Sequence, residues 1–367
     1  MGKGAGKGKS RLAPTYYQNY ILREDEHAPA GILSFQTPYG RGARAHSDEL
    51  LFIAIHQTYE LWFKVAIDEI LRANTGIVER IKAGHYVEAA KALRRLARIT
   101  TVLRDQYEIV GTITPTDFLV FRDVLRPSSG YDSAQFRALE LSSGLRGDGG
   151  YLRHLTGLDA AAMGGPDKVA DEVGALVRKM GEGAAPKGAH SVAQKLVATG
   201  DLNGLRLIHR SLASDSLRDA AYHALLAAEV HVEGWSRTKT QAWLKARMRE
   251  WSADQAEAAK GGPGLEVGVS AANAAQIELT IAGLYHGATR GGWDHSKEGA
   301  LLGLVEALMD YDQAFRNLRT IHINMVLRVI GGRPGTGGSS GARYLRSTLD
   351  YEFFPLLWRA RDHIEGP

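Results

Sequence analysis

Two histidines and an arginine are the side chains of this 367-residue chain that are best placed to do chemistry. His56 lies within the apolar stretch "DELLFIAIHQTYELWFK", Arg122 lies within "DFLVFRDVLRPSSG", and His322 opens "HINMVLRVIGGRPGTGGSSG". An imidazole can bind a metal or accept a hydrogen bond, and a guanidinium can hold a carboxylate through two parallel hydrogen bonds. Each also has an ordinary explanation, since a histidine on an apolar helical face is more often a core residue and an arginine more often pairs with an acid at the surface.

The spacing around His322 limits the metal that it could bind. Leu318, Met325 and Val329 share its helical stripe, so packing alone would explain the residue if no metal is bound. No histidine or carboxylate lies three or four residues away from it, as a zinc or di-iron helix would require. A single axial ligand to a haem iron needs no such partner. The chain has no cysteine, which excludes thiolate ligands and disulfides.

The glycine-rich loop after His322 differs from loops that bind nucleotide phosphates. Phosphate-binding loops precede a helix and carry a lysine, because the helix N-terminus favours anions. This loop instead follows a helix whose expected end is Gly331 and Gly332, and it offers hydroxyl groups, among them that of Thr336, without a lysine. We therefore expect that its ligand is not a nucleotide.

Helical periodicity dominates the chain and strand-like alternation is scarce, which predicts an all-α fold. His56 shares a stripe with Phe52, Tyr59 and Phe63 in a long helix predicted over 48–73. The other helices are predicted over 77–109, 117–125, 133–141, 214–256, 271–285, 299–329 and 344–364. Two glycine-rich stretches, 144–168 and 257–276, are predicted to be loops.

Composition and charge place the chain among globular proteins. We predict a flexible basic tail at 1–14 and a single all-α domain at 15–367, with a divergent helical insertion at about 147–270. The net charge of +4 is inflated by the lysine-rich start, so nucleic acid is not an expected partner. The sequence has no run of eighteen apolar residues and no apolar signal segment, which predicts a cytoplasmic protein that does not enter the membrane.

Three stretches together resemble the tryptophan 2,3-dioxygenase superfamily: "HSDELLFIAIHQTYELWFK", "FRDVLRPSSGYDSAQFR" and "HINMVLRVIGGRPGTGGSSGARYLRSTL". With "YQNY" upstream they bracket most of the chain, although the middle third resembles the family only weakly. The resemblance implies a helical oxygenase that uses haem b and dioxygen and acts on an indole amino acid. It also implies a homotetramer in which the N-terminal segment of one subunit helps to close the active site of its neighbour.

The resemblance also implies roles for individual residues. His322 matches the family's protein ligand to the iron, and Ser129 matches a serine at the haem edge. His56 matches the histidine that accepts a hydrogen bond from the indole N–H. Arg122 matches the arginine that binds the substrate carboxylate, and Thr336 matches the loop threonine that contacts the amino acid head. The loop is expected to act as a lid whose glycines let the backbone approach haem and substrate closely.

Four further matches line the substrate pocket, with apolar walls at Phe52 and Phe118 and tyrosines at Tyr17 and Tyr20. The sequence departs from the family pattern near this pocket. The usual "HDE" appears as "HSDE", and "SGFQSLQFR" appears as "SGYDSAQFR", with Asp132 in place of a glutamine. Asp132 is predicted to cap the helix that begins near Ser133, since aspartate is a favoured N-cap residue.

These departures leave two reactions open. N-formylkynurenine is the expected product, formed from L-tryptophan or a substituted tryptophan by insertion of both oxygen atoms. The alternative is a monooxygenase that forms a 2-oxindole from a substituted tryptophan such as β-methyltryptophan.

Two other classes of protein would use only part of this pattern. A non-catalytic haem-binding sensor would need His322 but no carboxylate clamp, so Arg122 and Thr336 count against it. A purely structural helical protein would use its histidines as core residues, and a Soret absorption band from the purified protein would exclude that class.

Overall fold

The computed structural model describes residues 31–40, 46–125, 130–146, 149–182, 191–228, 230, 232–258, 269–289, 296–336 and 340–364. This described part contains helices and no strand, which confirms the predicted all-α class. None of its helices is both long enough and apolar enough to cross a membrane.

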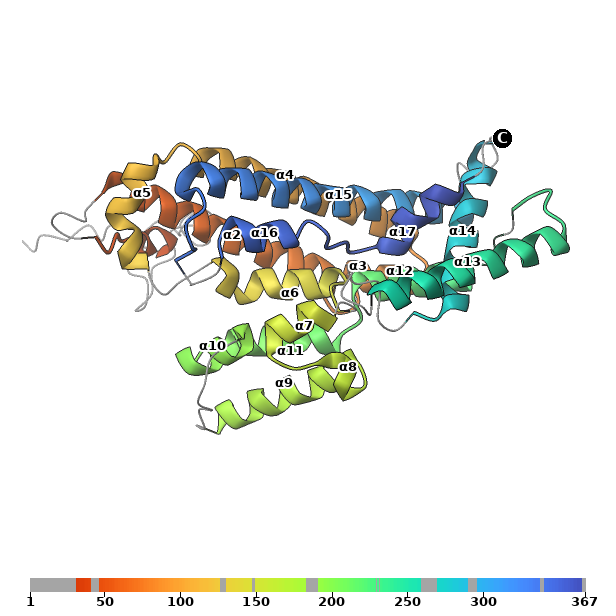
Figure 1. Cartoon of the computed structure of the whole chain (residues 1–367), viewed down its shortest axis with the longest axis horizontal. Helices are drawn as coiled ribbons and strands as arrows, with labels where there is room; N and C mark the ends of the chain where they lie inside the picture. Colours follow the sequence, from red (N-terminus) through yellow and green to blue (C-terminus); the bar gives the residue numbers. More distant parts are fainter. Residues whose placement is uncertain are drawn as a thin grey trace, which may run out of the picture.

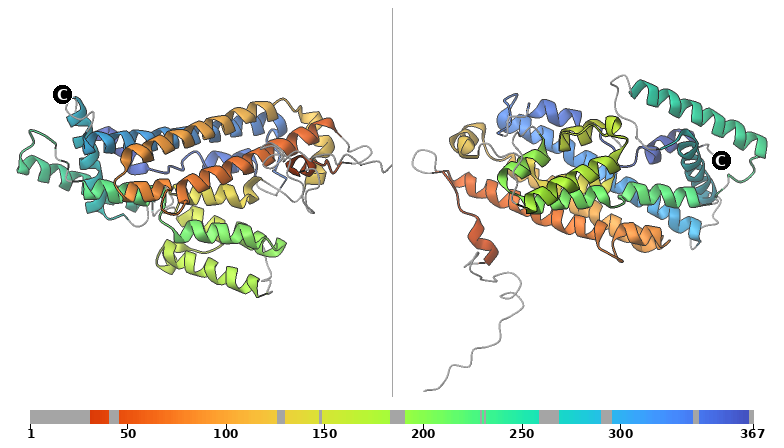
Figure 2. Two further views of the ribbon diagram at one scale, coloured as in Figure 1. Left: turned by 180° about the vertical axis from the view of Figure 1, so that it is seen from behind. Right: turned by 90° about the horizontal axis from the view of Figure 1, so that it is seen from below.

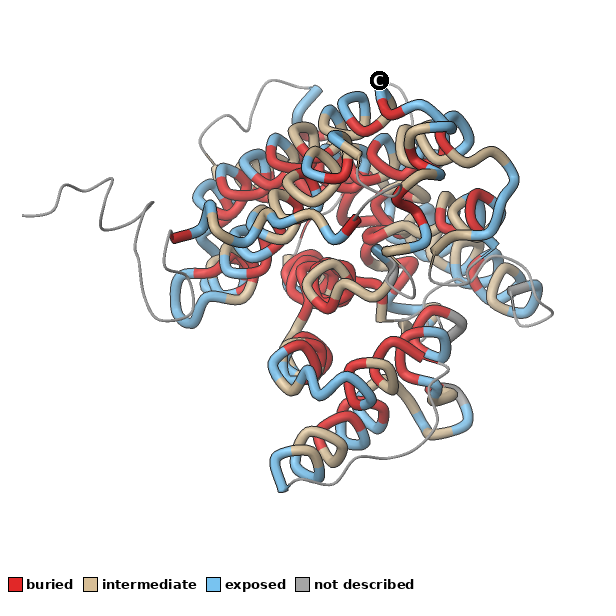
Figure 3. Tube along the Cα trace, turned by 90° about the vertical axis from the view of Figure 1, so that its left-hand side faces the viewer, coloured by how far each residue is buried: buried red, intermediate tan, exposed pale blue. Residues whose placement is uncertain are grey.

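Three long helices form the body of the molecule. These are α2 (Ser47–Leu71), α4 (Tyr86–Val110) and α15 (Lys297–Ile330), and α15 packs along α4 while α2 packs against both α4 and α6 (Ala134–Ser143) (Figure 1). Buried residues lie where these helices face one another (Figure 3). The helix α6 is buried on nearly every side, so it forms the centre of the fold.

The helix boundaries near the predicted site have clear local causes. The ring of His46 accepts a hydrogen bond from the backbone N–H of Asp48 and so caps α2. Thr114 caps α5 (Pro115–Phe121) through the N–H of Asp117, and a proline occupies the first helical position. At the other end of the chain, α15 stops at Gly331, whose φ of 60° few other residues adopt.

The middle of the chain forms a separate layer on one side of the body (Figures 1 and 2). It consists of α7 (Gly149–Thr156), α8 (Ala160–Met163), α9 (Pro166–Gly181), α10 (Val192–Thr199) and α11 (Leu202–Ala213). The helix α11 packs against both α9 and α6, which joins the layer to the body.

The prediction of a loop over 144–168 is wrong, because the helices α7 and α8 lie within this stretch. Tyr151, Leu152 and Leu155 of α7 are buried, and this burial stabilises a helix in a glycine-rich stretch of low intrinsic propensity. The hydrophobic effect of packing therefore outweighs the local preference for a turn.

Two of the predicted helices are divided into shorter elements. The pattern over 214–256 is divided into α12 (Leu217–Ala227) and α13 (Arg237–Ala258), with Gly234 at a φ of 81° between them. The pattern over 344–364 is divided into α16 (Ala342–Ser347), α17 (Pro355–Arg359) and η5 (Ala360–His363). Pro355 occupies the first helical position of α17, where its missing N–H costs no helical hydrogen bond, so a new helix begins there.

Two more elements complete this description. Gly84, at a φ of 75°, separates α3 (Ile77–Lys82) from α4, so the helix predicted over 77–109 is two helices. The prediction over 271–285 corresponds to α14 (Ala271–Thr289), which packs against α12, α13 and α15.

Candidate active site

A cavity of about 250 Å³ lies among α2, α4, α5, α6 and the C-terminal half of α15. The loop that follows α15 and the helix α16 contribute the rest of its wall. Six residues with roles predicted from the sequence line it: Phe52, His56, Phe118, Arg122, His322 and Thr336. The other three, Tyr17, Tyr20 and Ser129, lie outside the described residues.

His56 presents one ring nitrogen to the cavity as an acceptor. Its Nδ1 atom lies 2.7 Å from the backbone oxygen of Phe52, one turn earlier in α2. A carbonyl oxygen only accepts, so in the neutral ring Nδ1 carries the hydrogen and Nε2 keeps a lone pair. Burial lowers the pKa of His56, although the hydrogen bond to Phe52 and the charge of Glu60 oppose the change. The neutral form therefore predominates at neutral pH.

Aromatic rings line the cavity beside His56. The ring of Phe52 lies 4.0 Å from that of His56 and 5.8 Å from that of Phe118, measured between centroids. Phe121 packs behind them, with its centroid 5.4 Å from that of Phe118. Flat apolar walls of this kind suit a planar aromatic ligand.

Arg122 reaches the cavity from the end of α5, and its side chain is buried. Its Nη2 atom donates to the backbone oxygen of Pro334 in the loop after α15. Its Nε atom is buried without a hydrogen-bond partner, and within the described part of the chain no carboxylate pairs with the guanidinium. A surface ion pair therefore does not explain this residue. A buried cation without an acid is costly, and an anionic ligand would compensate for its charge.

The two described ends of the glycine loop lie close together beside the cavity. Gly335, Thr336 and Gly341 line the cavity. Gly341 has a φ of 60°, and a Cβ atom there would lie 2.6 Å from the backbone oxygen of Arg333. Only glycine fits a position with both constraints, so this glycine brings the two ends of the loop together.

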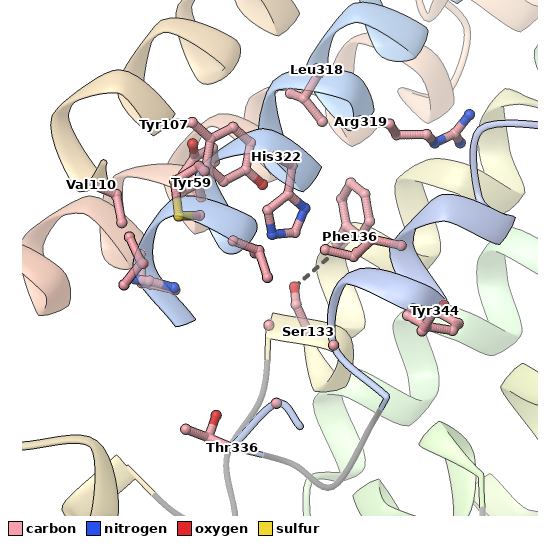
Figure 4. A pocket seen from close by; sticks show the side chains of 18 of the residues that line it. Tyr59, Tyr107, Val110, Ser133, Phe136, Leu318, Arg319, His322, Thr336 and Tyr344 are labelled. Carbon is pink, nitrogen blue, oxygen red and sulfur yellow. Dashed lines mark hydrogen bonds between the residues drawn. The ribbon is translucent and has the colours of Figure 1, made fainter. Parts of the chain in front are cut away.

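His322 projects into the cavity from α15 (Figure 4). Burial, together with the nearby charges of His56 and Arg137, lowers the pKa of its imidazole to about 4. Among the described residues neither ring nitrogen has a hydrogen-bond partner. The ring is therefore a neutral imidazole that presents a lone pair to a largely apolar space, which is the donor that an axial haem ligand requires.

The inner end of the cavity is charged. Arg137 and Arg319 flank Glu140, with N–O distances of 2.7 Å and 3.2 Å, and all three side chains are buried. Tyr151 donates a third hydrogen bond to Glu140 at 2.9 Å. These contacts satisfy the carboxylate, and they place a surplus positive charge near His322, which disfavours its protonation.

Comparison with known proteins shows the family of the chain. A family model described as tryptophan 2,3-dioxygenase matches residues 3–154 and 291–364. The chain belongs to the tryptophan 2,3-dioxygenase family. The tryptophan 2,3-dioxygenase of Caulobacter vibrioides is 33% identical over 348 residues, which cover 95% of this chain and 98% of the relative. That of Anaeromyxobacter dehalogenans is 32% identical and covers 86% of each chain.

Membership of the tryptophan 2,3-dioxygenase family confirms the resemblance seen in the sequence. It also makes the chain an enzyme of this type. The family model leaves residues 155–290 between its two matched ranges, and the helices from α8 to α14 lie within them. The insertion predicted at about 147–270 stays a prediction.

The position at which this chain departs from the family pattern has a structural partner. Asp132 lies in η4 (Gly130–Asp132), and its carboxylate is 2.8 Å from Nζ of Lys195 in α10. The predicted capping role is wrong, because Ser133 accepts the hydrogen bond from the N–H of Phe136 and so caps α6. Asp132 lies one residue before the N-cap position, so it cannot accept that hydrogen bond. Its ion pair with Lys195 instead connects the middle layer to the wall of the cavity.

Sequence reasoning missed Tyr107, whose ring stacks on that of His322 with centroids 4.5 Å apart. Its stripe in α4, with Leu103 and Val110, indicates that it faces the core. The stripe gives no sign that His322, in a helix more than two hundred residues later, would lie against it.

Proposed function

We propose that this protein catalyses the haem-dependent dioxygenation of L-tryptophan to N-formylkynurenine. The observation that carries the proposal is the content of one cavity: a neutral histidine with an open lone pair, a second histidine that offers an acceptor, and a buried arginine without an acid. These are His322 for the iron, His56 for the indole N–H and Arg122 for the carboxylate. When bound, haem b supplies the activation of dioxygen and the redox chemistry of oxygen transfer.

The protein's own contribution is to bind the substrate in one orientation. Arg122 binds the carboxylate, and Thr336 contacts the amino acid head from the glycine loop. At the other end of the substrate, His56 accepts the indole N–H at Nε2, and Phe52 and Phe118 hold the faces of the ring. Fixing both ends leaves the indole a single pose, which lowers the entropic cost of the reaction.

His56 acts by positioning rather than by removing a proton. An indole N–H is a very weak acid, and the lowered pKa of His56 makes the imidazole a weak base. The hydrogen bond is worth about 1 kcal/mol, which is enough to select the orientation of the ring.

Arg122 keeps a donor open for the substrate carboxylate. The guanidinium donates to the Pro334 oxygen and has a further N–H group without a partner in the described part of the chain. A carboxylate is a stronger acceptor than a peptide oxygen, and it adds the charge that this buried cation lacks. The contact with Pro334 also links the clamp to the loop that carries Thr336.

The monooxygenase alternative rested on the departures from the family pattern: "HSDE", the altered motif around Asp132 and a longer segment after Tyr20, which lies outside the described residues. The ion pair with Lys195 gives that aspartate a structural role, and the family comparison supports dioxygenation. We therefore propose no second function. A haem sensor would not need a buried arginine in the same cavity as the iron ligand.

We also propose the homotetramer that the family implies. Apolar side chains are exposed along η1 (Gly31–Phe35) and the neighbouring face of α2, among them Leu33, Phe35, Leu61 and Val65. Exposed apolar surface of this kind is typical of an interface. Light scattering coupled to size-exclusion chromatography tests the assembly, and a monomer at micromolar concentration would contradict it.

Labelled dioxygen provides the direct test of the function. The purified haem protein is reduced under anaerobic conditions, mixed with L-tryptophan and then given ¹⁸O₂, and the product is analysed by mass spectrometry. We expect a ring-opened product with two labelled atoms, and no product from His322→Ala. One labelled atom in an intact bicyclic indoline or oxindole would overturn the proposal.

A further inference from the structure

The imidazole of His322 lies flat against the ring of Tyr107. The two planes differ by 7°, and the centroids are 4.5 Å apart. The residues come from α15 and α4, which pack along each other. Figure 4 shows Tyr107 beside the imidazole, which points into the cavity. A stacked ring in close contact opposes rotation of the imidazole about its bond to Cβ.

Apart from this stack, no hydrogen bond or ion pair holds the imidazole within the described part of the chain. A histidine that binds a metal usually donates its second N–H group to a carboxylate or a carbonyl, and that bond sets the orientation of the ring. His322 has no such acceptor among the described residues. Its orientation must therefore depend on the surfaces that touch it.

Tyr107 also contacts the ring of Tyr59 in α2. The centroids of the two phenol rings are 5.2 Å apart. The Tyr59 hydroxyl donates to the backbone oxygen of Leu103 at 2.7 Å, one turn before Tyr107 in α4. The stack is thus supported through three helices, from α2 through α4 to α15.

We propose that Tyr107 is a positioning residue for the haem site, whose ring sets the plane of the His322 imidazole and so the direction in which it meets the iron. The inference rests on the proposed function, because it requires His322 to be the iron ligand. It assigns the effect to the aromatic face of Tyr107 and not to the hydroxyl.

The test compares haem proteins in which Tyr107 keeps or loses its ring. Tyr107→Phe keeps the ring, whereas Tyr107→Leu and Tyr107→Met remove it. Tyr86→Leu is the matched control, because it removes another buried tyrosine from α4. The control position lies 21 residues away (107 minus 86), or about 30 Å along the helix. The measurements are the rate of haem transfer to an excess of apomyoglobin and the iron–histidine stretching band of the ferrous protein.

We expect both non-aromatic variants to lose haem about 10- to 100-fold faster than the parent, which is the usual effect of removing a group that orients a metal ligand. Their iron–histidine band should shift or broaden. Tyr107→Phe should match the parent in both measurements. Tyr86→Leu should lower the melting temperature without changing the band. Agreement of Tyr107→Leu or Tyr107→Met with the parent would overturn the inference, and so would a Tyr107→Phe variant that behaves like them.

His322→Ala separates this inference from the proposed function. If the variant keeps the parent's histidine-ligated spectrum, then the assignment of the iron ligand fails, and the role of Tyr107 fails with it. If it loses that spectrum while the non-aromatic variants at Tyr107 keep the parent's band, only the positioning role is wrong.

Discussion

At the scale of single residues, the charge of Arg122 is the feature that most constrains function. Losing a desolvated, charge-assisted clamp costs about 2–4 kcal/mol. Arg122→Ala should therefore raise the KM for L-tryptophan by about 30- to 700-fold. Arg122→Lys keeps the charge but cannot form the bidentate pair, so its KM should lie between that of the parent and that of Arg122→Ala. Steady-state kinetics provide the measurement. The assignment of Arg122 to the substrate carboxylate would be wrong if tryptamine, which lacks the carboxylate, bound to the parent as tightly as tryptophan does.

The lowered pKa of His56 predicts how kcat/KM depends on pH. Burial lowers its pKa below the ordinary 6.5, so Nε2 stays unprotonated at neutral pH. As the pH falls through the lowered pKa, the ring gains a proton and Nε2 becomes a donor that cannot accept the indole N–H. The kcat/KM of the parent should therefore decrease only below pH 6.5.

The variant His56→Ala supplies the comparison. It should lower kcat/KM about fivefold at pH 7.5, because one neutral hydrogen bond is worth about 1 kcal/mol. The decrease of kcat/KM at acid pH, the acid limb of the pH profile, should also be absent from the variant. An acid limb of the same midpoint in the variant would assign that limb to another group.

At the scale of elements, the glycine loop depends on backbone conformations that other residues rarely adopt. Gly331 and Gly341 both have a φ of 60°, with ψ of −135° and −127°. A Cβ atom at 331 would meet nothing within 4 Å, whereas one at 341 would meet the Arg333 oxygen at 2.6 Å. The pair therefore separates conformational strain from a steric clash.

Alanine at either position should lower the free energy of unfolding, by about 1–3 kcal/mol from backbone strain alone. Gly341→Ala should cost more than Gly331→Ala because of the added clash. It should also raise the KM for L-tryptophan, since it moves the loop that carries Thr336. Urea unfolding and steady-state kinetics measure the two effects. Equal losses of stability would show that the loop relaxes around the added methyl group.

At the scale of the whole molecule, α5, which lines the cavity, and the helices α13 and α14 lie at different ends of the long helices α4 and α15 (Figure 1). His363 of η5 lies between α13 and α14. The Nη1 atom of Arg247 donates to its Nε2 atom at 2.7 Å, and Glu250 and Glu278 lie 3.9 Å from the same atom. An imidazole nitrogen that accepts a bond from an arginine must be unprotonated. This end therefore packs around a neutral histidine.

The cluster around His363 makes stability depend on pH. Burial and Arg247 lower its pKa, and the opposing charge of Glu250 does not reverse the change. Between pH 6.5 and that lowered pKa the unfolded chain binds more protons than the folded one, so stability is lost as the pH falls. His363→Gln should remove part of this loss. The measurement is the difference in unfolding free energy between parent and variant at pH 7.5 and pH 5.5, and a difference independent of pH would contradict the assignment.

Local sequence patterns were enough to predict the all-α class, most of the long helices and the family. Helical periodicity is a local property, and ordered motifs around His56, Arg122 and His322 need no structure to be seen. Packing decided the rest. The stretch at 144–168 is helical because α7 is buried, and Asp132 pairs with Lys195 because α10 lies beside the cavity wall. Tyr107 meets His322 for the same reason. Contacts between residues far apart along the chain depend on how helices pack, and no local pattern encodes that arrangement.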